Sequence, residues 1–149
     1  ALSTGRKIRV LNIMDDWTRE SLADYADFSI PAEKVVTVLQ DIIAERGTPD
    51  QIRVDNGPEF LSKVFTNWCN KKGIEIKFIQ PGRPMQNGYI ERLNRTFRED
   101  ILDAYEFETL EQVRILSDEW QHTYNHLHPH KSLKRKTPDA FRRNLIINE

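Results

Sequence analysis

The sequence contains a single cysteine, Cys69, among its 149 residues. One cysteine cannot form a disulfide within the chain, so a reducing, intracellular setting is the default expectation. No apolar run approaches the about 20 residues that a membrane-spanning helix needs, and no segment resembles a signal peptide. We therefore expect neither a membrane partner nor export. Beside Trp68, Cys69 is expected to fill the core rather than to act as a nucleophile.

An excess of one charge is also missing, because the formal net charge is −1. The composition alone therefore gives no signal for nucleic acid. The basic residues are unevenly distributed, however, with six basic and two acidic side chains in residues 127–149. This basic end could contact phosphate or could be a solvated polar tail, and its charge alone favours the tail.

The periodicity of apolar residues predicts a single α/β domain. Alternating, branched residues predict strands at 7–14, 21–28, 51–54 and 74–79. Helical spacing predicts helices at 31–46, 62–72, 87–102 and 110–125, and Thr137-Pro138 is typical of the start of a last short helix. A strand pair followed by alternating helices and strands indicates a mixed sheet.

The stretch RVDNGPEF places an acid, Asp55, directly after a short strand. An ordinary turn is one interpretation, because Asp, Asn, Gly and Pro are the residues that turns prefer. The other interpretation needs a partner acid, and Glu91 is a candidate on a helix behind a loop rich in Pro and Gly. Asn87, Arg95 and Arg98 project onto the same polar face of that helix.

Taken alone, Glu91 and Arg95 would form an ordinary i, i+4 ion pair. The combination of the two acids points further, because converging carboxylates without a base between them are costly unless a cation is present. Oxygen ligands select Mg²⁺ or Mn²⁺, and a pair of such ions can hold the attacking and leaving oxygens in phosphoryl transfer. Two acids hold one ion poorly, and a pair of ions needs at least three.

Asp55 and Glu91 have 35 residues between them, within DNGPEF and PGRPMQNGYIERLNRTFRED. This pattern resembles the D,D(35)E class, the retroviral-integrase-like catalytic core of insertion-sequence transposases, and most closely the second-frame protein of the IS3 family. The stretches GRKIRVLNIMDDWTRE, ERGTPDQIRVDNGPEF, W…YNHLHPHKSL and KTPDAF follow in the expected order. The resemblance therefore covers nearly the whole chain.

The resemblance implies an RNase H-like fold, a mixed sheet flanked by helices. It also implies metal-dependent cleavage of DNA at transposon ends and strand transfer into a target, with Asp55 and Glu91 as ligands and two Mg²⁺ or Mn²⁺ ions in the complete site. A homo-oligomer in the bacterial cytoplasm, at the nucleoid, is expected. The expected DNA contacts are Arg83, Gln86, Asn87, Arg95, Arg98 and Lys131.

One expected acid is missing, because the family's first catalytic aspartate lies on the strand before GRKIRV and no acid precedes Asp15 here. Asp15 and Asp16 are expected to start a turn capped by their own side chains. We therefore expect a core over about 1–125 with a truncated first strand and a basic C-terminal extension, with helices, over about 126–149. The gap in the sheet should be filled by rearrangement or by pairing between chains.

The missing acid also bears on function. As it stands, the chain is expected not to cleave or join DNA and to bind metal weakly. A catalytically inactive DNA-binding or assembly module is therefore the alternative interpretation.

Four histidines raise a separate possibility, since His122 and His126 are spaced i, i+4 and His128 and His130 follow. A zinc site is one hypothesis. No cysteine pair accompanies the histidines, so a polar or DNA-facing surface is the favoured interpretation. His128 stands where the family usually has arginine, which weakens the expectation of a phosphate contact there.

Overall fold

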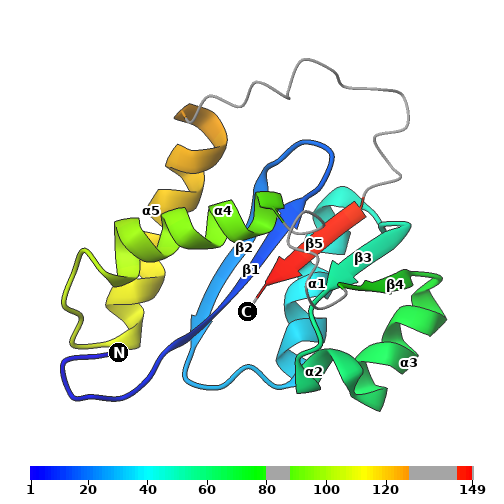
Figure 1. Cartoon of the computed structure of the whole chain (residues 1–149), viewed down its shortest axis with the longest axis horizontal. Helices are drawn as coiled ribbons and strands as arrows, with labels where there is room; N and C mark the ends of the chain where they lie inside the picture. The colour runs from blue at the N-terminus through cyan, green and yellow to red at the C-terminus, as the bar shows by residue number, and fades with distance from the viewer. Residues whose placement is uncertain (80–87, 128–143, 149) are drawn as a thin grey trace.

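The computed structural model describes residues 1–79, 88–127 and 144–148, which form a five-stranded sheet with helices on both faces (Figure 1). Alternating apolar residues form most of the strands, as the sequence predicts. The strands are β1 (Arg9–Asp15), β2 (Ser21–Asp27), β3 (Gln51–Val54), β4 (Glu75–Phe78) and β5 (Asn144–Asn148).

The helices match the predicted segments closely, and two end at glycines. Gly47 (φ 86°) and Gly73 (φ 72°) adopt backbone angles that side chains disfavour, and they follow the first and third helices. The predicted helix at 87–102 is divided, because its last turn is π-helical, and a short helix at 58–61 was not predicted. The helical elements are α1 (Ala32–Arg46), α2 (Pro58–Leu61), α3 (Lys63–Lys72), α4 (Gly88–Phe97), the π-helical turn η2 (Arg98–Leu102) and α5 (Leu110–Leu127). None of these helices is long and apolar enough to cross a membrane.

The strand order is β2-β1-β5-β3-β4, so the last strand of the chain lies at the centre of the sheet (Figure 1). β5 is antiparallel to β1 and parallel to β3. Among the described strands, β1 and β3 are connected only through β5. Residues 144–148 were predicted to belong to a basic extension outside the core, and they instead join the two halves of the sheet. Within the described residues, a strand of the same chain thus forms the centre of the sheet.

Alternation along β5 places apolar side chains on both faces of the sheet. Leu145 and Ile147 pack with residues of α1, α2 and α3 on one face. Ile146 packs on the other face with Met14, α4 and α5. All three β5 side chains are at most 2% exposed. The expected last helix near Thr137-Pro138 lies outside the described residues.

Candidate functional site

Asp55 follows β3 directly, at the edge of the sheet where the parallel strands β3 and β5 both end. Its Oδ1 accepts a hydrogen bond from the backbone N–H of Gly57 at 2.8 Å. Pro58 then begins α2, where its fixed φ suits the first helical position. Local turn chemistry therefore holds the carboxylate at the strand end.

Asp55 lines a cavity of about 300 Å³ between the turn after β3, the start of β1 and the helix α4–η2. Its polar lining combines two acids with two arginines and an asparagine. The lining residues are Ile8, Arg9, Val10, Asp55, Gly57, Pro58, Glu59, Asn94, Arg98 and Leu102. Three segments distant in sequence thus meet around one carboxylate.

Glu59 joins Asp55 in this cavity across Gly57. Gly57 has φ −57° and ψ 146°, which any residue can adopt, so its backbone does not require glycine. A Cβ at this position would lie 2.4 Å from Glu59 Oε1 and 3.0 Å from Asp55 Oδ1. Both oxygens therefore border the same small space above the glycine. The absence of a side chain at Gly57 lets the two carboxylates converge.

Asn12 connects the sheet to α4 beside this cavity. It is fully buried in β1, and its Nδ2 donates a hydrogen bond to Asn94 Oδ1 at 2.8 Å. Asn12 Oδ1 has no hydrogen-bond partner among the described residues. A buried polar residue needs such partners, so a single Asn within the apolar run RVLNIMD was the available sequence signal. This pair was not predicted from the sequence.

Glu91 is exposed on α4, one helical turn before Asn94, and does not line the cavity. Arg95 is also exposed, while Arg98 lines the cavity. The predicted buried face of the helix is confirmed, because Ile90, Leu93, Phe97 and Ile101 are at most 4% exposed. Four further predicted contacts, Arg83, Gln86, Asn87 and Lys131, lie outside the described residues.

Asp15 and Asp16 form a turn, as predicted. Asp15 Oδ1 accepts the backbone N–H groups of Trp17 at 2.8 Å and Thr18 at 3.1 Å. Asp16 forms ion pairs with Arg19 and Arg53. The carboxylates of Asp15 and Asp16 are therefore engaged in structural contacts.

Asp55 and Glu59 supply the oxygen donors that Mg²⁺ and Mn²⁺ prefer, and the space over Gly57 keeps their oxygens close together. The donor set is incomplete, since no group of three or more His, Cys, Asp or Glu residues in the described ranges could hold a metal ion. Beside Arg9 and Arg98, the two carboxylates give the cavity oxygen donors for a divalent cation but not a complete ligand set.

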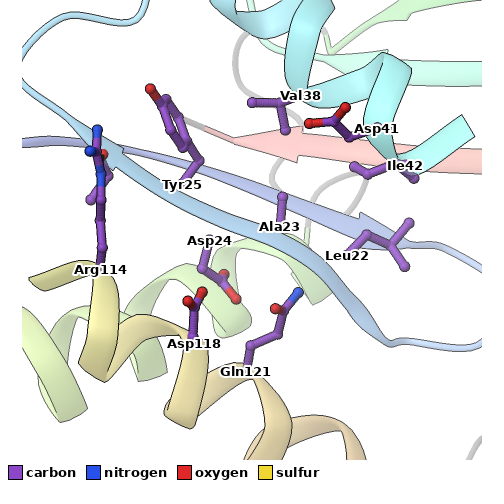
Figure 2. Close-up of a pocket in the computed structure, with 11 residues that line it drawn as sticks. Leu22, Ala23, Asp24, Tyr25, Val38, Asp41, Ile42, Arg114, Asp118 and Gln121 are labelled. Carbon is purple, nitrogen blue, oxygen red and sulfur yellow. Dashed lines mark hydrogen bonds between the residues drawn. The ribbon is translucent and has the colours of Figure 1, made fainter. Parts of the chain in front are cut away.

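A second cavity, of about 430 Å³, lies between β2, α1 and α5 (Figure 2). Figure 2 shows Asp24 of β2 directed toward Asp118 and Gln121 of α5. Burial raises the pKa of Asp24 to about 7; a hydrogen bond from Ser21 opposes this shift, and Asp118 adds to it. The cavity shares no residue with the predicted catalytic motifs.

The raised pKa predicts that folding stability falls as the pH rises from about 4 to about 7. In this range the folded chain holds a proton on Asp24 that the unfolded chain, with a pKa of 3.8, has released. The slope is at most about 1.4 kcal/mol per pH unit. In urea unfolding, Asp24→Asn should gain stability over the natural chain between pH 5 and pH 8. The exposed Asp118→Asn should show a smaller change, and a pH-independent difference for Asp24→Asn would contradict a proton held on Asp24.

The contacts of the remaining residues, the histidines, Cys69 and Trp120, indicate structural roles. The rings of His122 and His126 are tilted by 43° with centroids 4.4 Å apart, and no third ligand joins them among the described residues. His128 and His130 lie outside those residues. Cys69 is fully buried, and burial raises the pKa of its thiol to about 12, which disfavours the nucleophilic thiolate. Trp120 of α5 is partly buried and packs against Phe97 with ring centroids 5.1 Å apart.

Comparisons with known proteins agree with this architecture. Two family models, each described as "Integrase core domain", match residues 1–84 and 72–138. The chain is 41% identical over 144 residues to an uncharacterized 39.2 kDa protein of insertion element IS476 from Xanthomonas euvesicatoria, covering 97% of this chain and 42% of that protein. It is 37% identical over 141 residues to an uncharacterized 31.7 kDa protein of insertion element IS407 from Burkholderia multivorans, covering 95% and 51%. The chain thus spans about half the length of these relatives.

The fold also resembles a solved structure, the catalytic core domain of HTLV-2 integrase in complex with magnesium in its trimeric form. The TM-score is 0.60 at 19% identity, with 84% of this chain and 85% of that chain covered. At this identity the likeness establishes the fold, which is the retroviral-integrase-like arrangement that the sequence predicts. With a family model matching more than half of its length, the chain belongs to the integrase core domain family.

Proposed function

We propose that the chain is the catalytic core of a DNA transposase that cleaves phosphodiester bonds and transfers strands with the help of Mg²⁺ or Mn²⁺. The proposal rests on the placement of Asp55 at the end of β3, where it lines a cavity together with Asn94 and Arg98. Asn94 lies on α4, the helix that also carries Glu91, and Arg98 lies on η2, which continues it. Asp55 and Glu91 are the proposed metal ligands, with two ions in the complete site. The proposed substrates are the ends of the insertion element and its target DNA, and the proposed assembly is a homo-oligomer at the bacterial nucleoid.

The residues around Asp55 would have different roles in metal binding, phosphate binding and positioning. When bound, the metal supplies charge neutralisation and a more acidic attacking hydroxyl. Arg98 lies on the cavity and is suited to hold a phosphate oxygen near Asp55. Asn12, through Asn94, fixes α4 against the sheet, and Glu91 lies three residues, about 4.5 Å of helix rise, from Asn94. Catalysis would then consist mainly of positioning and electrostatic stabilisation.

One observation favours a second function. The described residues contain no group of three metal-binding side chains, although two-ion chemistry needs at least three acids. The chain alone could therefore act as an inactive DNA-binding or assembly module. In that case it would bind the element ends and contribute nothing to bond cleavage.

A nicking assay separates the two functions. With Mn²⁺ and a duplex carrying the end of its own insertion element, residues 1–149 are expected to leave both strands intact. A chain extended upstream of Ala1 within its reading frame should nick one strand, because the extension supplies the missing first acid. Fluorescence anisotropy on the same duplex verifies that both chains bind it. An extended chain that binds but stays inert with both metals would favour the module, and nicking by residues 1–149 would overturn the requirement for an upstream acid.

A further inference from the structure

We propose that the cavity beside β2 binds an extended segment of a partner protein, in which basic and apolar side chains alternate and which pairs with β2 as an added strand. β2 is an edge strand, because β1 is its only neighbour in the described sheet. The cavity of about 430 Å³ lies on this edge, with α1 on one side and α5 on the other (Figure 2). It shares no lining residue with the cavity at Asp55, so the inference is independent of the proposed metal site.

The free edge of β2 is available for pairing in its middle, because side chains of α5 occupy both of its ends. Arg114 Nε donates a hydrogen bond to the backbone carbonyl of Ala26 at 3.0 Å. At the other end, Asn125 accepts the backbone N–H of Ser21 at 2.8 Å and donates to its carbonyl at 2.9 Å. In the described part of the chain, the backbone of residues 22–25 forms no hydrogen bond outside the pairing with β1. An incoming strand can add its own backbone hydrogen bonds there.

The two walls of the cavity suit different side chains. Successive residues of β2 alternate in direction, so Tyr25 packs with the core that contains α1, whereas Asp24 faces α5 (Figure 2). The side chains of an added strand alternate in the same way. The α1 wall, which is largely apolar, is formed by Val38, Asp41 and Ile42, and the α5 wall, which is polar, by Arg114, Asp118 and Gln121. Every second side chain of the added strand would therefore meet an apolar wall, and the others would meet Asp24 and Asp118.

Asp24 points independently to a missing cationic partner. Its Oδ2 accepts a hydrogen bond from Ser21 Oγ, but its Oδ1 is buried and has no hydrogen-bond partner among the described residues. A buried oxygen without a donor is costly, and burial raises the pKa of Asp24 to about 7. Arg114, the basic residue of the lining, already forms an ion pair with Asp27 at 3.4 Å. A lysine or arginine of the added strand would supply both a donor and a positive charge to Asp24 and Asp118.

Two synthetic peptides test the charge of the occupant. One is an acetylated and amidated heptapeptide that alternates valine and lysine, and the other carries glutamate in place of each lysine. In ¹⁵N spectra of residues 1–149, the lysine peptide should shift the amides of residues 22–25 selectively. The glutamate peptide should bind at least about ten-fold more weakly, because it loses the charge-assisted hydrogen bond and adds like charge to the acidic wall.

Asp24→Asn tests the residue that the inference depends on. The variant keeps the shape of the side chain and should bind the lysine peptide about ten-fold more weakly, as expected for the loss of a hydrogen bond between charged groups. Glu33→Gln, which changes an exposed acid of α1 outside the cavity, is the matched control and should keep the natural affinity. Equal affinity of the natural chain for the lysine and glutamate peptides would overturn the inference, as would unshifted amides at 22–25 with the lysine peptide at millimolar concentration.

N-methylation of the lysine peptide tests the added strand itself. Methyl groups on the backbone nitrogens of alternate residues remove the N–H donors from one edge of the peptide and leave its charges in place. The set that faces β2 should weaken binding at least about ten-fold and the other set should not, since main-chain hydrogen bonds supply the affinity in strand addition. Equal effects of the two sets would overturn pairing with β2.

Sedimentation velocity combined with hydrogen exchange tests the other occupant, a second copy of this chain. The chain without peptide should exchange the amides of the free β2 edge readily, and the lysine peptide should slow that exchange. A dimer that protects the amides of residues 22–25 without peptide would assign the cavity to a second copy and overturn the partner segment. None of these measurements depends on Asp55, so the proposed function is tested separately by the nicking assay.

Discussion

Deletion of residues 144–149 is expected to abolish cooperative folding of the chain. β5 pairs with β1 on one side and with β3 on the other. Its removal therefore separates the described sheet into two halves. Burial of its three apolar side chains contributes roughly 5–9 kcal/mol, against a typical net stability of about 5–15 kcal/mol. Urea titration followed by circular dichroism should show a sigmoidal transition for the whole chain and none for the shortened one.

A milder pair of substitutions separates the role of the strand from a general effect of truncation. Ile147 is fully buried in β5, whereas Ile115 on α5 is 51% exposed. Ile147→Ala should lower the free energy of unfolding by about 2–5 kcal/mol because it leaves a cavity in the core. Ile115→Ala should change it by less than about 0.5 kcal/mol. A shortened chain that unfolds at the natural urea midpoint would contradict a central β5.

In the upstream-extended chain, Asp55→Asn is expected to reduce the rate of strand nicking by about 10³-fold or more. Loss of the proposed metal ligand removes several kcal/mol of transition-state stabilisation, and a change of about 1.4 kcal/mol in the barrier is a factor of ten in rate. Asparagine preserves the volume of the side chain and an acceptor for the Gly57 N–H. The comparison is made from single-turnover rates at saturating Mn²⁺.

Asp50→Asn supplies the matched control, because Asp50 is an exposed acid immediately before β3, at the opposite end of the strand from Asp55. It should nick DNA at the natural rate. The affinity for the DNA duplex should be similar for both variants, since the effect of Asp55 is assigned to the chemical step. Equal rates for Asp55→Asn and Asp50→Asn would remove Asp55 from the catalytic site.

Much of the fold could be predicted because local sequence determines it. The period of α1, the stop at Gly47 and the alternation of β1 are local signals, and the predicted helices and strands that fall within the described residues were found within a few residues of their expected bounds. β5 could not be predicted in this way. Its sequence, NLIIN, is a short apolar run beside a basic segment, and its pairing with β1 brings Asn148 opposite Asn12, from the other end of the chain. Only the tertiary structure shows that both faces of this strand are covered.

The candidate site was predictable where a strand end and a turn determine it, as at Asp55. The position of Glu59 in the cavity beside Asp55 could not be predicted, because a short helix at 58–61 has too few residues to produce a periodic signal and because the space over Gly57 is a three-dimensional feature. Asn12 was missed because its partner, Asn94, is 82 residues away. The roles of Asp55 and Glu91 as metal ligands stay predictions.

Anomalous diffraction from crystals of the upstream-extended chain soaked in Mn²⁺ tests the proposed metal site most directly. We expect the strongest anomalous peak at coordination distance from a carboxylate oxygen of Asp55, about 2.1 Å by analogy with Mg²⁺. The peak should disappear in Asp55→Asn crystals soaked under the same conditions. Manganese bound elsewhere, for example at Asp24 and Asp118, with none at Asp55 would contradict a metal-dependent site at the end of β3.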